Sequence, residues 1–308
     1  MSDHEGDDTD ASAVALGRRT FLKGIAAVTS AAGALLAMTQ MGLSTRAVAD
    51  ALPTKCSRQQ APMKNVEGKV AFITGGTSGI GLGIARAFVE AGMKIAITYR
   101  NKDQLNQALT HFENLGARVH TVDVDVADRA GMERAAAETV KIFGKVHVLV
   151  NNAGVIAPET LSATSYDAWD GLMKVNLNGP FNGIRAFLPH IRSHNEGGHI
   201  IMTSSILGLF AGSGGSGGGA YAVSKFALVG MTEALRAELA GTNIGASVFC
   251  PGTVTSNDPN LVKSELETGR VVLRGMRKND LYILTRPEYE GIMRSIYATE
   301  RERRRCAR

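Results

Sequence analysis

The sequence is poor in cysteine, proline and aromatic residues. Its 308 residues include 3 cysteines and 8 prolines, and aromatic residues make up 6% of the chain. Three cysteines exclude a framework of several disulfides, and the low proline content excludes a collagen-like or proline-rich disordered chain. Hydrophobic residues reach 44% of the chain, which is ample for a packed core.

The excess of positive charge is small and gathers at one end. The net charge is +5, and much of it comes from a basic tail at residues 301–308. A short basic end is usually a solvated one, so we expect no nucleic-acid partner. The sequence also shows no spacing of histidine, cysteine and acidic residues that is typical of a metal site, and we expect none.

The first 49 residues have the layout of an export signal. A polar start leads to Arg18-Arg19, an uncharged apolar stretch follows at about residues 24–44, and Ala47-Val48-Ala49 offers a cleavage site. The arginine pair resembles the twin-arginine signal, which is read by an export machinery that takes folded proteins. We therefore expect export to the periplasm or cell envelope. The alternatives are an uncleaved membrane anchor, since about 20 residues span a bilayer, and a cytoplasmic protein.

A flexible lead-in is expected at residues 50–67, and a single domain at residues 68–300. Within that domain, short apolar runs alternate with helical patterns, which predicts βαβ units and a parallel sheet. We expect a doubly wound Rossmann fold, with about seven mainly parallel strands and helices on both faces. The expected strands are residues 69–74, 94–99, 118–124, 146–151, 199–203, 246–250 and 281–285, and the expected helices are 80–91, 104–115, 129–143, 167–193, 221–239 and 287–297.

A glycine-rich turn joins the first expected strand to the first helix. It reads Thr74-Gly75-Gly76-Thr77-Ser78-Gly79-Ile80-Gly81. Glycines let the backbone approach a pyrophosphate, and the helix N-terminus offers N–H donors and a positive dipole end. The spacing is Gly-x-x-x-Gly-x-Gly rather than Gly-x-Gly-x-x-Gly, and turns of this kind also occur for packing alone.

Four further features accompany this turn. The run Asn151-Asn152-Ala153-Gly154 ends the fourth strand, Asn176 lies inside the long helix, Ser204-Ser205 ends the fifth strand, and Tyr221-Ala222-Val223-Ser224-Lys225 opens the next helix. In order and spacing, the set resembles the classical short-chain dehydrogenase/reductase family over about residues 68–255. The resemblance implies an NAD(P)-dependent oxidoreductase that interconverts a secondary alcohol and a ketone by hydride transfer. The alternative is a Rossmann protein that binds or senses NADP(H) without turnover.

The resemblance also implies a role for each of these residues. Tyr221 exchanges a proton with the substrate, and Lys225, four residues on, lies on the same helix face and holds the nicotinamide ribose. A phenol has a pKa near 10, so we expect the Lys225 ammonium and the positive nicotinamide to favour phenolate. Ser205 bonds the developing alkoxide, with Ser204 as its competitor, and Asn176 holds a water for a proton relay.

The end of the second strand indicates NADP rather than NAD. An acid there bonds the ribose hydroxyls of NAD, whereas arginine suits the extra phosphate of NADP. The chain has Tyr99-Arg100-Asn101-Lys102, with two cations and no acid at the strand end. The alternative is that Arg100 and Lys102 are ordinary solvated charges. The cofactor contacts that the resemblance implies are Gly75, Thr77, Ser78, Gly79, Ile80, Gly81, Arg100, Asp125, Val126, Asn152, Ala153, Gly154, Tyr221, Lys225, Pro251, Gly252, Thr253, Val254 and Thr255.

The substrate and the assembly are less sharply defined by the sequence. Residues 256–300, which shape the substrate site in the family, contain leucine, valine, methionine and tyrosine but no evident charged trap for an acidic substrate. We therefore expect an apolar secondary alcohol or ketone. Family members commonly pack two long helices against copies of themselves, so helices 167–193 and 221–239 predict a homodimer or homotetramer.

Overall fold

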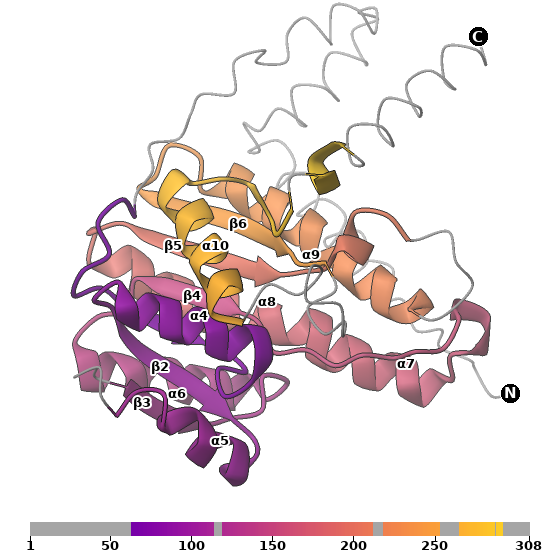
Figure 1. Cartoon of the computed structure of the whole chain (residues 1–308), viewed down its shortest axis with the longest axis horizontal. Coiled ribbons are helices and arrows are strands. Elements are labelled where there is room, and N and C mark those ends of the chain that lie inside the picture. The colour runs from indigo at the N-terminus through magenta and orange to yellow at the C-terminus, as the bar shows by residue number, and fades with distance from the viewer. Residues whose placement is uncertain (1–62, 114–118, 212–217, 253–264, 287, 292–308) are drawn as a thin grey trace, which may run out of the picture. The chain divides into compact units, whose positions relative to one another are not determined.

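The structure is a computed structural model of the chain, and it describes residues 63–113, 119–211, 218–252, 265–286 and 288–291 (Figure 1). The chain divides into two units, Met1–Arg58 and Gln59–Arg308. All of the described residues lie in the second unit. The expected export signal, residues 50–62 of the lead-in and the basic tail lie outside them.

One sheet of seven parallel strands forms the centre of this unit, in the order β3-β2-β1-β4-β5-β6-β7. This confirms the predicted Rossmann fold. The chain runs outward from β1 to β3 on one side and from β4 to β7 on the other, so the carboxyl ends of β1 and β4 form the switch point where such sheets bind ligands. The strands are β1 (Val70–Ile73), β2 (Lys94–Tyr99), β3 (Val119–Asp123), β4 (Val148–Asn151), β5 (Gly198–Thr203), β6 (Ile244–Cys250) and β7 (Tyr282–Leu284).

Helices cover both faces of the sheet, as Figure 1 shows. Helices α4, α5 and α10 share one hydrophobic core cluster with the strands, and α6, α8 and α9 share the other. Helix α7 packs in a smaller cluster with the first turn of α9. The helices are α4 (Gly79–Glu90), α5 (Lys102–Leu109), α6 (Arg129–Phe143), α7 (Tyr166–Met173), α8 (Gly179–Ser193), α9 (Gly219–Glu238) and α10 (Glu265–Lys278).

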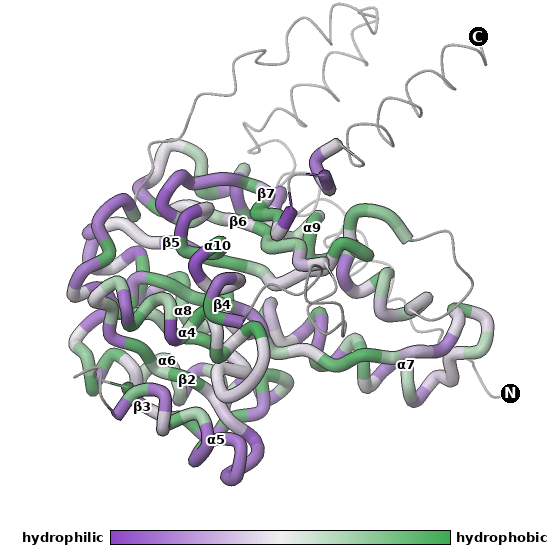
Figure 2. The backbone as a smooth tube through the Cα atoms, in the orientation of Figure 1, coloured by the Kyte–Doolittle hydropathy of each residue, from purple (hydrophilic) through white to green (hydrophobic). Residues whose placement is uncertain are grey.

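The inner strands of the sheet are buried along their whole length. Every residue of β1, β4, β5 and β6 is buried, which is the pattern of parallel strands covered on both faces. Figure 2 shows this hydrophobic centre in green, with the hydrophilic helices α5 and α10 at its outside. In the part of the chain that the structure describes, no helix combines the length and apolar character needed to cross a membrane.

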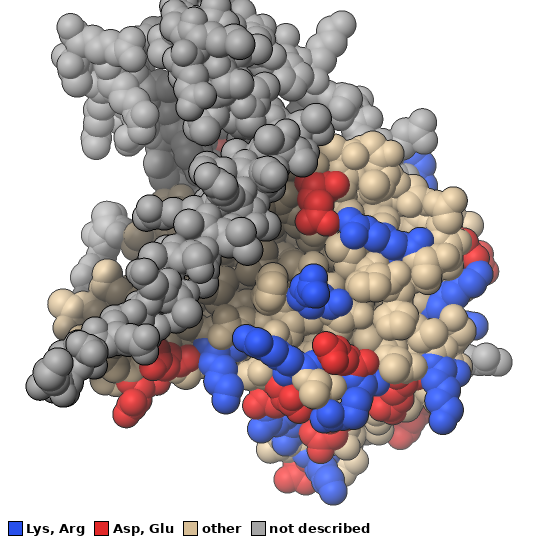
Figure 3. Space-filling view, turned by 180° about the vertical axis from the view of Figure 1, so that it is seen from behind, with Lys and Arg blue, Asp and Glu red and all other residues tan. Residues whose placement is uncertain are grey.

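Charges of both signs are interspersed on the surface, as Figure 3 shows for one face. Several exposed arginines pair with acids: Arg134 with Asp128 at 3.3 Å, and Arg192 with Glu238 at 2.8 Å. Surface pairs of this kind contribute little to stability.

Two expected helices differ from the structure. The helix expected at 167–193 is divided into α7 and α8 by a π-helical turn at Lys174–Asn178, called η2, and α8 has Pro180 in its first turn. The helix expected at 104–115 ends at Leu109. The π-helical turn places the buried Asn176 side chain toward the segment after β4, which is a tertiary contact that helical periodicity does not reveal.

Helix α10, which lies within the segment expected to shape the substrate site, was not expected as a helix. It packs on α4. A Cβ built on Gly269 would lie 2.0 Å from the carbonyl oxygen of Gly83, so the two backbones cross where both helices carry glycine. Val272 and Met276 are fully buried on the same face. Of the last expected helix, 287–297, the described residues 288–291 are helical.

Candidate active site

The turn between β1 and α4 depends on three glycines. Gly75 and Gly79 have φ values of 63° and 52°, which side-chain-bearing residues rarely adopt. A Cβ on Gly81 would lie 2.0 Å from the Gly75 carbonyl oxygen. The N–H of Gly75 donates to Thr98 Oγ1 on β2 over 2.8 Å. These contacts fix the turn at the switch point of the sheet.

The N-terminus of α4 has the properties of a phosphate site. Its N-cap residue, Ser78, makes no side-chain cap hydrogen bond, and its first turn contains no acid. The direction in which a Gly79 Cβ would point is open space. Among the described residues, the N–H groups and the positive end of this 12-residue helix thus have neither a side-chain cap from Ser78 nor an acid in the first turn. The residues present fit the pyrophosphate of the dinucleotide expected from the sequence.

The segment after β4 is tied to this turn by Thr74. Its Oγ1 accepts hydrogen bonds from the N–H groups of Asn152 at 2.8 Å and Ala153 at 3.0 Å. The Asn152 amide donates in return to the carbonyl oxygens of Thr74 at 3.1 Å and Gly75 at 3.3 Å. Two groups of predicted cofactor contacts thus lie side by side. Thr74 was not among the predicted site residues, although its place directly before the first glycine was a signal.

Three of the predicted catalytic side chains meet at the carboxyl end of β5 and the start of α9. The hydroxyl of Ser205 lies close enough to the phenol of Tyr221 to lower its pKa, and Lys225 Nζ lies 5.4 Å from the centre of the Tyr221 ring. Ser205 Oγ also accepts from the N–H of Leu207 at 3.2 Å. Accepting this bond does not use the hydroxyl hydrogen of Ser205, which can be donated to an oxygen at this site.

Lys225 is buried and is held by the end of β5. Its Nζ donates to the Thr203 carbonyl oxygen over 2.9 Å, and the residue is 4% exposed. Burial lowers the pKa of Lys225 to about 8. At neutral pH the ammonium is therefore the main form of Lys225, and the pKa lies closer to neutral pH than that of an exposed lysine.

The acidity of Tyr221 differs from the expectation. Burial raises the pKa of this phenol above its usual value, and the hydrogen bond with Ser205 opposes that shift. From the sequence, the Lys225 ammonium is expected to favour phenolate. In the protein by itself burial dominates, because desolvation penalises the charged form.

The two neighbouring serines have different surroundings. Ser204 is buried, and its hydroxyl donates to the Lys225 carbonyl oxygen over 2.7 Å. It thereby holds α9 against β5, whereas Ser205 faces Tyr221. The geometry therefore favours Ser205 over Ser204 as the residue that contacts substrate, and Ser204 has a structural role that the sequence did not indicate.

Asn176 is 1% exposed and its side-chain amide is occupied within the protein. Oδ1 accepts from the N–H of Val155 at 2.8 Å, and Nδ2 donates to the Val155 carbonyl at 2.9 Å and to Ser224 Oγ at 3.1 Å. Both amide hydrogens are thus used. A relay water would have to bind the remaining lone pair of Oδ1 or the Asn176 carbonyl, so the predicted water role stays a prediction.

The predicted adenosine contacts meet at the ends of β2 and β3. Arg100 pairs with Asp125 at 2.8 Å, with side chains 65% and 42% exposed. The N–H of Ala127 and then Arg100 lower the pKa of the Asp125 carboxyl. Val126 is buried, and its carbonyl accepts from Asn182 Nδ2 over 2.9 Å. The cation expected to bind the extra phosphate of NADP is therefore at the site, with an acid beside it.

The last predicted cofactor loop is described in part. Pro251 and Gly252 directly follow β6, and the N–H of Gly252 donates to Thr285 Oγ1 over 3.2 Å. A Cβ on Gly252 would lie 2.0 Å from the hydroxyl of Tyr289. Thr253, Val254 and Thr255 lie outside the described residues.

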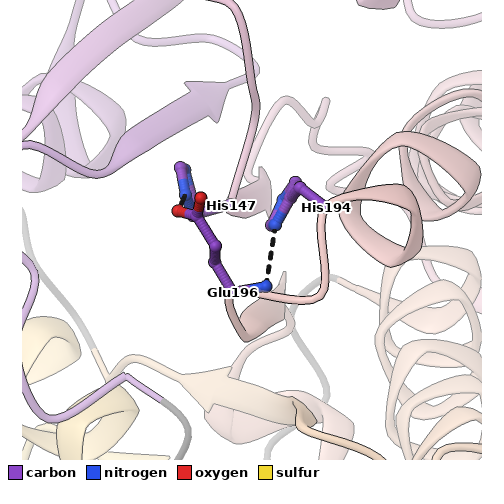
Figure 4. A group of neighbouring side chains, drawn as sticks. All are labelled: His147, His194 and Glu196. Atoms are coloured by element: carbon purple, nitrogen blue, oxygen red, sulfur yellow. Dashed lines mark hydrogen bonds and ion pairs between the residues drawn. The ribbon is translucent and has the colours of Figure 1, made fainter.

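A second polar cluster lies at the opposite, amino-terminal edge of the sheet (Figure 4). His147 Nε2 bonds Glu196 Oε2 at 3.1 Å, and His147 Nδ1 accepts from the N–H of Val70 at 3.2 Å. His194 Nδ1 accepts from the N–H of Glu196 at 3.1 Å, and its Nε2 bonds the Val146 carbonyl at 2.8 Å. The cluster joins the starts of β1 and β4 to the loop before β5.

Two histidines and a glutamate have the composition of a zinc site, and their ligand atoms lie within 4.8 Å of one another. The hydrogen bonds are unfavourable for a metal. A metal on His147 Nε2 would move the ring proton to Nδ1, where the N–H of Val70 already points. The Glu196 carboxylate is also held by the ammonium groups of Lys69 and Lys145. We interpret the cluster as a structural clamp, in which burial lowers the pKa of His147 to about 4.

Comparison with known proteins agrees with this geometry. A family model described as short chain dehydrogenase matches residues 69–265. The Cα-dehydrogenase of Sphingobium sp. is 38% identical over 196 residues, which cover 63% of this chain and 63% of that protein. The 3beta-hydroxysteroid dehydrogenase 2 of Eggerthella lenta is 38% identical over 193 residues, 62% of this chain and 72% of the relative. The match therefore spans under two thirds of the Sphingobium protein.

Solved structures of similar proteins include complexes with both nicotinamide cofactors. A short chain dehydrogenase/reductase from Burkholderia phymatum in complex with NAD has a TM-score of 0.68 and 30% identity, over 75% of this chain and 93% of the other. A short chain dehydrogenase from Burkholderia cenocepacia in complex with NADP has a TM-score of 0.63 and 25% identity, over 71% and 96%.

Proposed function

Because the chain belongs to the short chain dehydrogenase family, we propose that it interconverts an apolar secondary alcohol and a ketone by hydride transfer, with NADP as cofactor and Tyr221 as the acid/base. Oxidoreductase chemistry on CH–OH groups and an NAD(P) cofactor accompany that membership. The observation that supports the finer proposal is the convergence of Ser205, Tyr221 and Lys225 at the switch-point edge of the sheet.

The geometry gives each side chain a task. The Tyr221 hydroxyl passes a proton to or from the substrate oxygen, and Ser205, which lies beside that hydroxyl, donates its hydrogen to the substrate oxygen when substrate is bound. Lys225 keeps a cation beside the phenol ring while the Thr203 carbonyl fixes its position. The nicotinamide, when bound, accepts or supplies the hydride and in its oxidised form adds positive charge. That charge favours phenolate, which burial alone disfavours.

A binding protein without turnover is the competing function. A panel of secondary alcohols and their ketones, such as 1-phenylethanol, cyclohexanol and 2-octanol, separates the two when NADP(H) and NAD(H) are followed by absorbance. We expect turnover with NADP(H). Binding of the cofactor without any turnover would favour the alternative.

The apolar character of the proposed substrate is supported by two residues beside the site. Val155 and Ile156, 43% and 77% exposed, follow directly on the predicted contact Gly154.

The preference for NADP is tested by Arg100→Ala. Removing a charge-assisted bond costs about 1–3 kcal/mol, so we expect NADPH binding to weaken by that amount and NADH binding to change little, as measured by fluorescence titration. Arg134→Ala is the matched control, because Arg134 is also an exposed arginine paired with an acid. Equal losses for the two cofactors would show that Arg100 does not contact the phosphate.

We also propose a homodimer or homotetramer that packs through α8 and α9. Both helices expose aromatic side chains: Phe181 is 52% exposed and Phe226 is 39% exposed. The neighbouring Val223 is 40% exposed. Exposed large apolar side chains such as these are candidates for contacts between copies of the chain. Light scattering at micromolar concentration tests the assembly, and a strictly monomeric protein would contradict it.

The proposal for localisation is export in the folded state through the twin-arginine machinery. A nicotinamide enzyme outside the cytoplasm needs its cofactor, so we propose that NADP is bound before export and stays bound. A nanomolar complex requires about −12 kcal/mol. Cell fractionation should place the wild type in the envelope fraction with bound nucleotide, and Arg18-Arg19→Lys-Lys should keep it cytoplasmic. A cytoplasmic wild type free of nucleotide would contradict both ideas.

A further inference from the structure

A buried serine links three parts of the candidate site. Ser224 is fully buried, and its hydroxyl donates to the Tyr221 carbonyl oxygen over 2.7 Å. The hydroxyl oxygen of Ser224 in turn accepts a hydrogen bond from Asn176 Nδ2 over 3.1 Å. Asn176 exchanges two hydrogen bonds with the backbone of Val155, at 2.8 and 2.9 Å. One hydroxyl thus connects the first turn of α9, through η2, to the segment after β4.

The directions of these bonds are fixed. A serine hydroxyl has a single hydrogen, and Ser224 gives it to the carbonyl of Tyr221. Its oxygen must then accept from Asn176, so the amide nitrogen of Asn176 faces Ser224 and the amide oxygen faces the N–H of Val155. Each polar atom has one role, and the network therefore permits a single arrangement of the Asn176 amide.

We propose that Ser224 is a positioning residue, which fixes the Asn176 amide and so sets Tyr221 relative to the Gly154–Val155 backbone. The proposal rests on the oxidoreductase function proposed above. A Cβ on Gly154 would lie 3.2 Å from Asn176 Oδ1 and 3.5 Å from Lys225 Nζ. A change in the Asn176 amide would therefore move backbone that borders the Lys225 ammonium.

A second residue on the same helix provides the comparison. Thr232, two turns further along α9, is also fully buried, and its Oγ1 donates to the Leu228 carbonyl over 2.7 Å. Among the described residues its recorded hydrogen bond stays within α9. Such bonds from a side chain to its own helix are common and have no functional meaning by themselves. Ser224 differs because it also accepts from another element.

The test compares Ser224→Ala with Thr232→Val in the full-length protein, since each removes one buried hydroxyl. Turnover of 1-phenylethanol, cyclohexanol and 2-octanol with NADP gives kcat, KM and the pH profile of kcat. Fluorescence titration gives the affinity for NADPH. Amide hydrogen exchange of residues 152–156 reports the order of the segment after β4, and it does not depend on turnover.

We expect Ser224→Ala to lower kcat by about tenfold to a hundredfold, the range for a small misplacement of reacting groups. The pH profile of kcat should shift, NADPH affinity should stay within threefold, and exchange at residues 152–156 should accelerate. Thr232→Val should change none of these.

Wild-type kcat and wild-type exchange in Ser224→Ala would overturn the proposal. So would an equal loss of kcat in Thr232→Val, because the effect would then be one of general stability. If the wild type turns over none of the alcohols, the proposed function is wrong. Hydrogen exchange of residues 152–156 then still decides whether Ser224 orders the segment after β4.

Discussion

Tyr221→Phe should abolish turnover and leave cofactor binding intact. The substitution removes one oxygen and keeps the ring over which Lys225 Nζ lies, 5.4 Å from the centre. General acid–base catalysis contributes about 10²–10⁴-fold, so we expect kcat for the alcohol panel to fall by that factor. NADPH should still bind, since the glycine turn after β1 and most of the expected cofactor contacts do not involve the Tyr221 hydroxyl.

Tyr166→Phe is the matched control for this experiment. Tyr166 is 90% exposed at the start of α7, so loss of its hydroxyl should change neither turnover nor binding. Near wild-type turnover in Tyr221→Phe would remove Tyr221 from the reaction. A parallel loss of NADPH binding would instead show that the variant had disturbed the cofactor site.

Acid should destabilise the protein through His147. The folded pKa of His147 is about 4, against 6.5 in the unfolded chain. At a pH between these two pKa values, His147 binds a proton in the unfolded chain but not in the folded protein. The free energy of unfolding therefore falls as the pH falls. Burial is the main cause; Lys69 and His194 act in the same direction, and Glu196 opposes them. The shift corresponds to a loss of about 2 kcal/mol between pH 7 and 5.

The measurement is urea unfolding at pH 7 and pH 5 for the wild type and His147→Asn. The Asn amide keeps an acceptor for the N–H of Val70 but does not titrate, so the variant should lose about 2 kcal/mol less than the wild type over this range. His111→Asn, at an exposed histidine, should behave as the wild type. Parallel losses in wild type and His147→Asn would show that His147 protonates equally in both states.

The fold could be predicted because its signals are local. Buried parallel strands appear as short apolar runs, and the alternation with amphipathic segments fixes the βαβ order. The runs at 94–99 and 129–143 match β2 and α6 residue for residue. Helix α10 was missed because its role depends on Gly269 meeting Gly83, some 186 positions earlier (269 − 83). No property of either segment alone reveals that crossing.

The candidate site was predictable in its members and less so in its details. The motifs placed Ser205, Tyr221 and Lys225 at neighbouring strand and helix ends, and the structure brings them together. The choice between Ser204 and Ser205 needed the contact of Ser204 with the Lys225 carbonyl. The role of Ser224 also depended on a partner 48 residues away, Asn176.

The sequence by itself determined the order of elements, the glycine turn and the set of polar residues at the strand ends, because these follow from local periodicity and spacing. Only the tertiary structure decided how those residues act on one another. Burial raises the pKa of Tyr221 where an adjacent cation was expected to lower it, and Asp125 pairs with the arginine predicted to bind phosphate. Desolvation and hydrogen bonding depend on which segments pack together, and that information is spread over the whole fold.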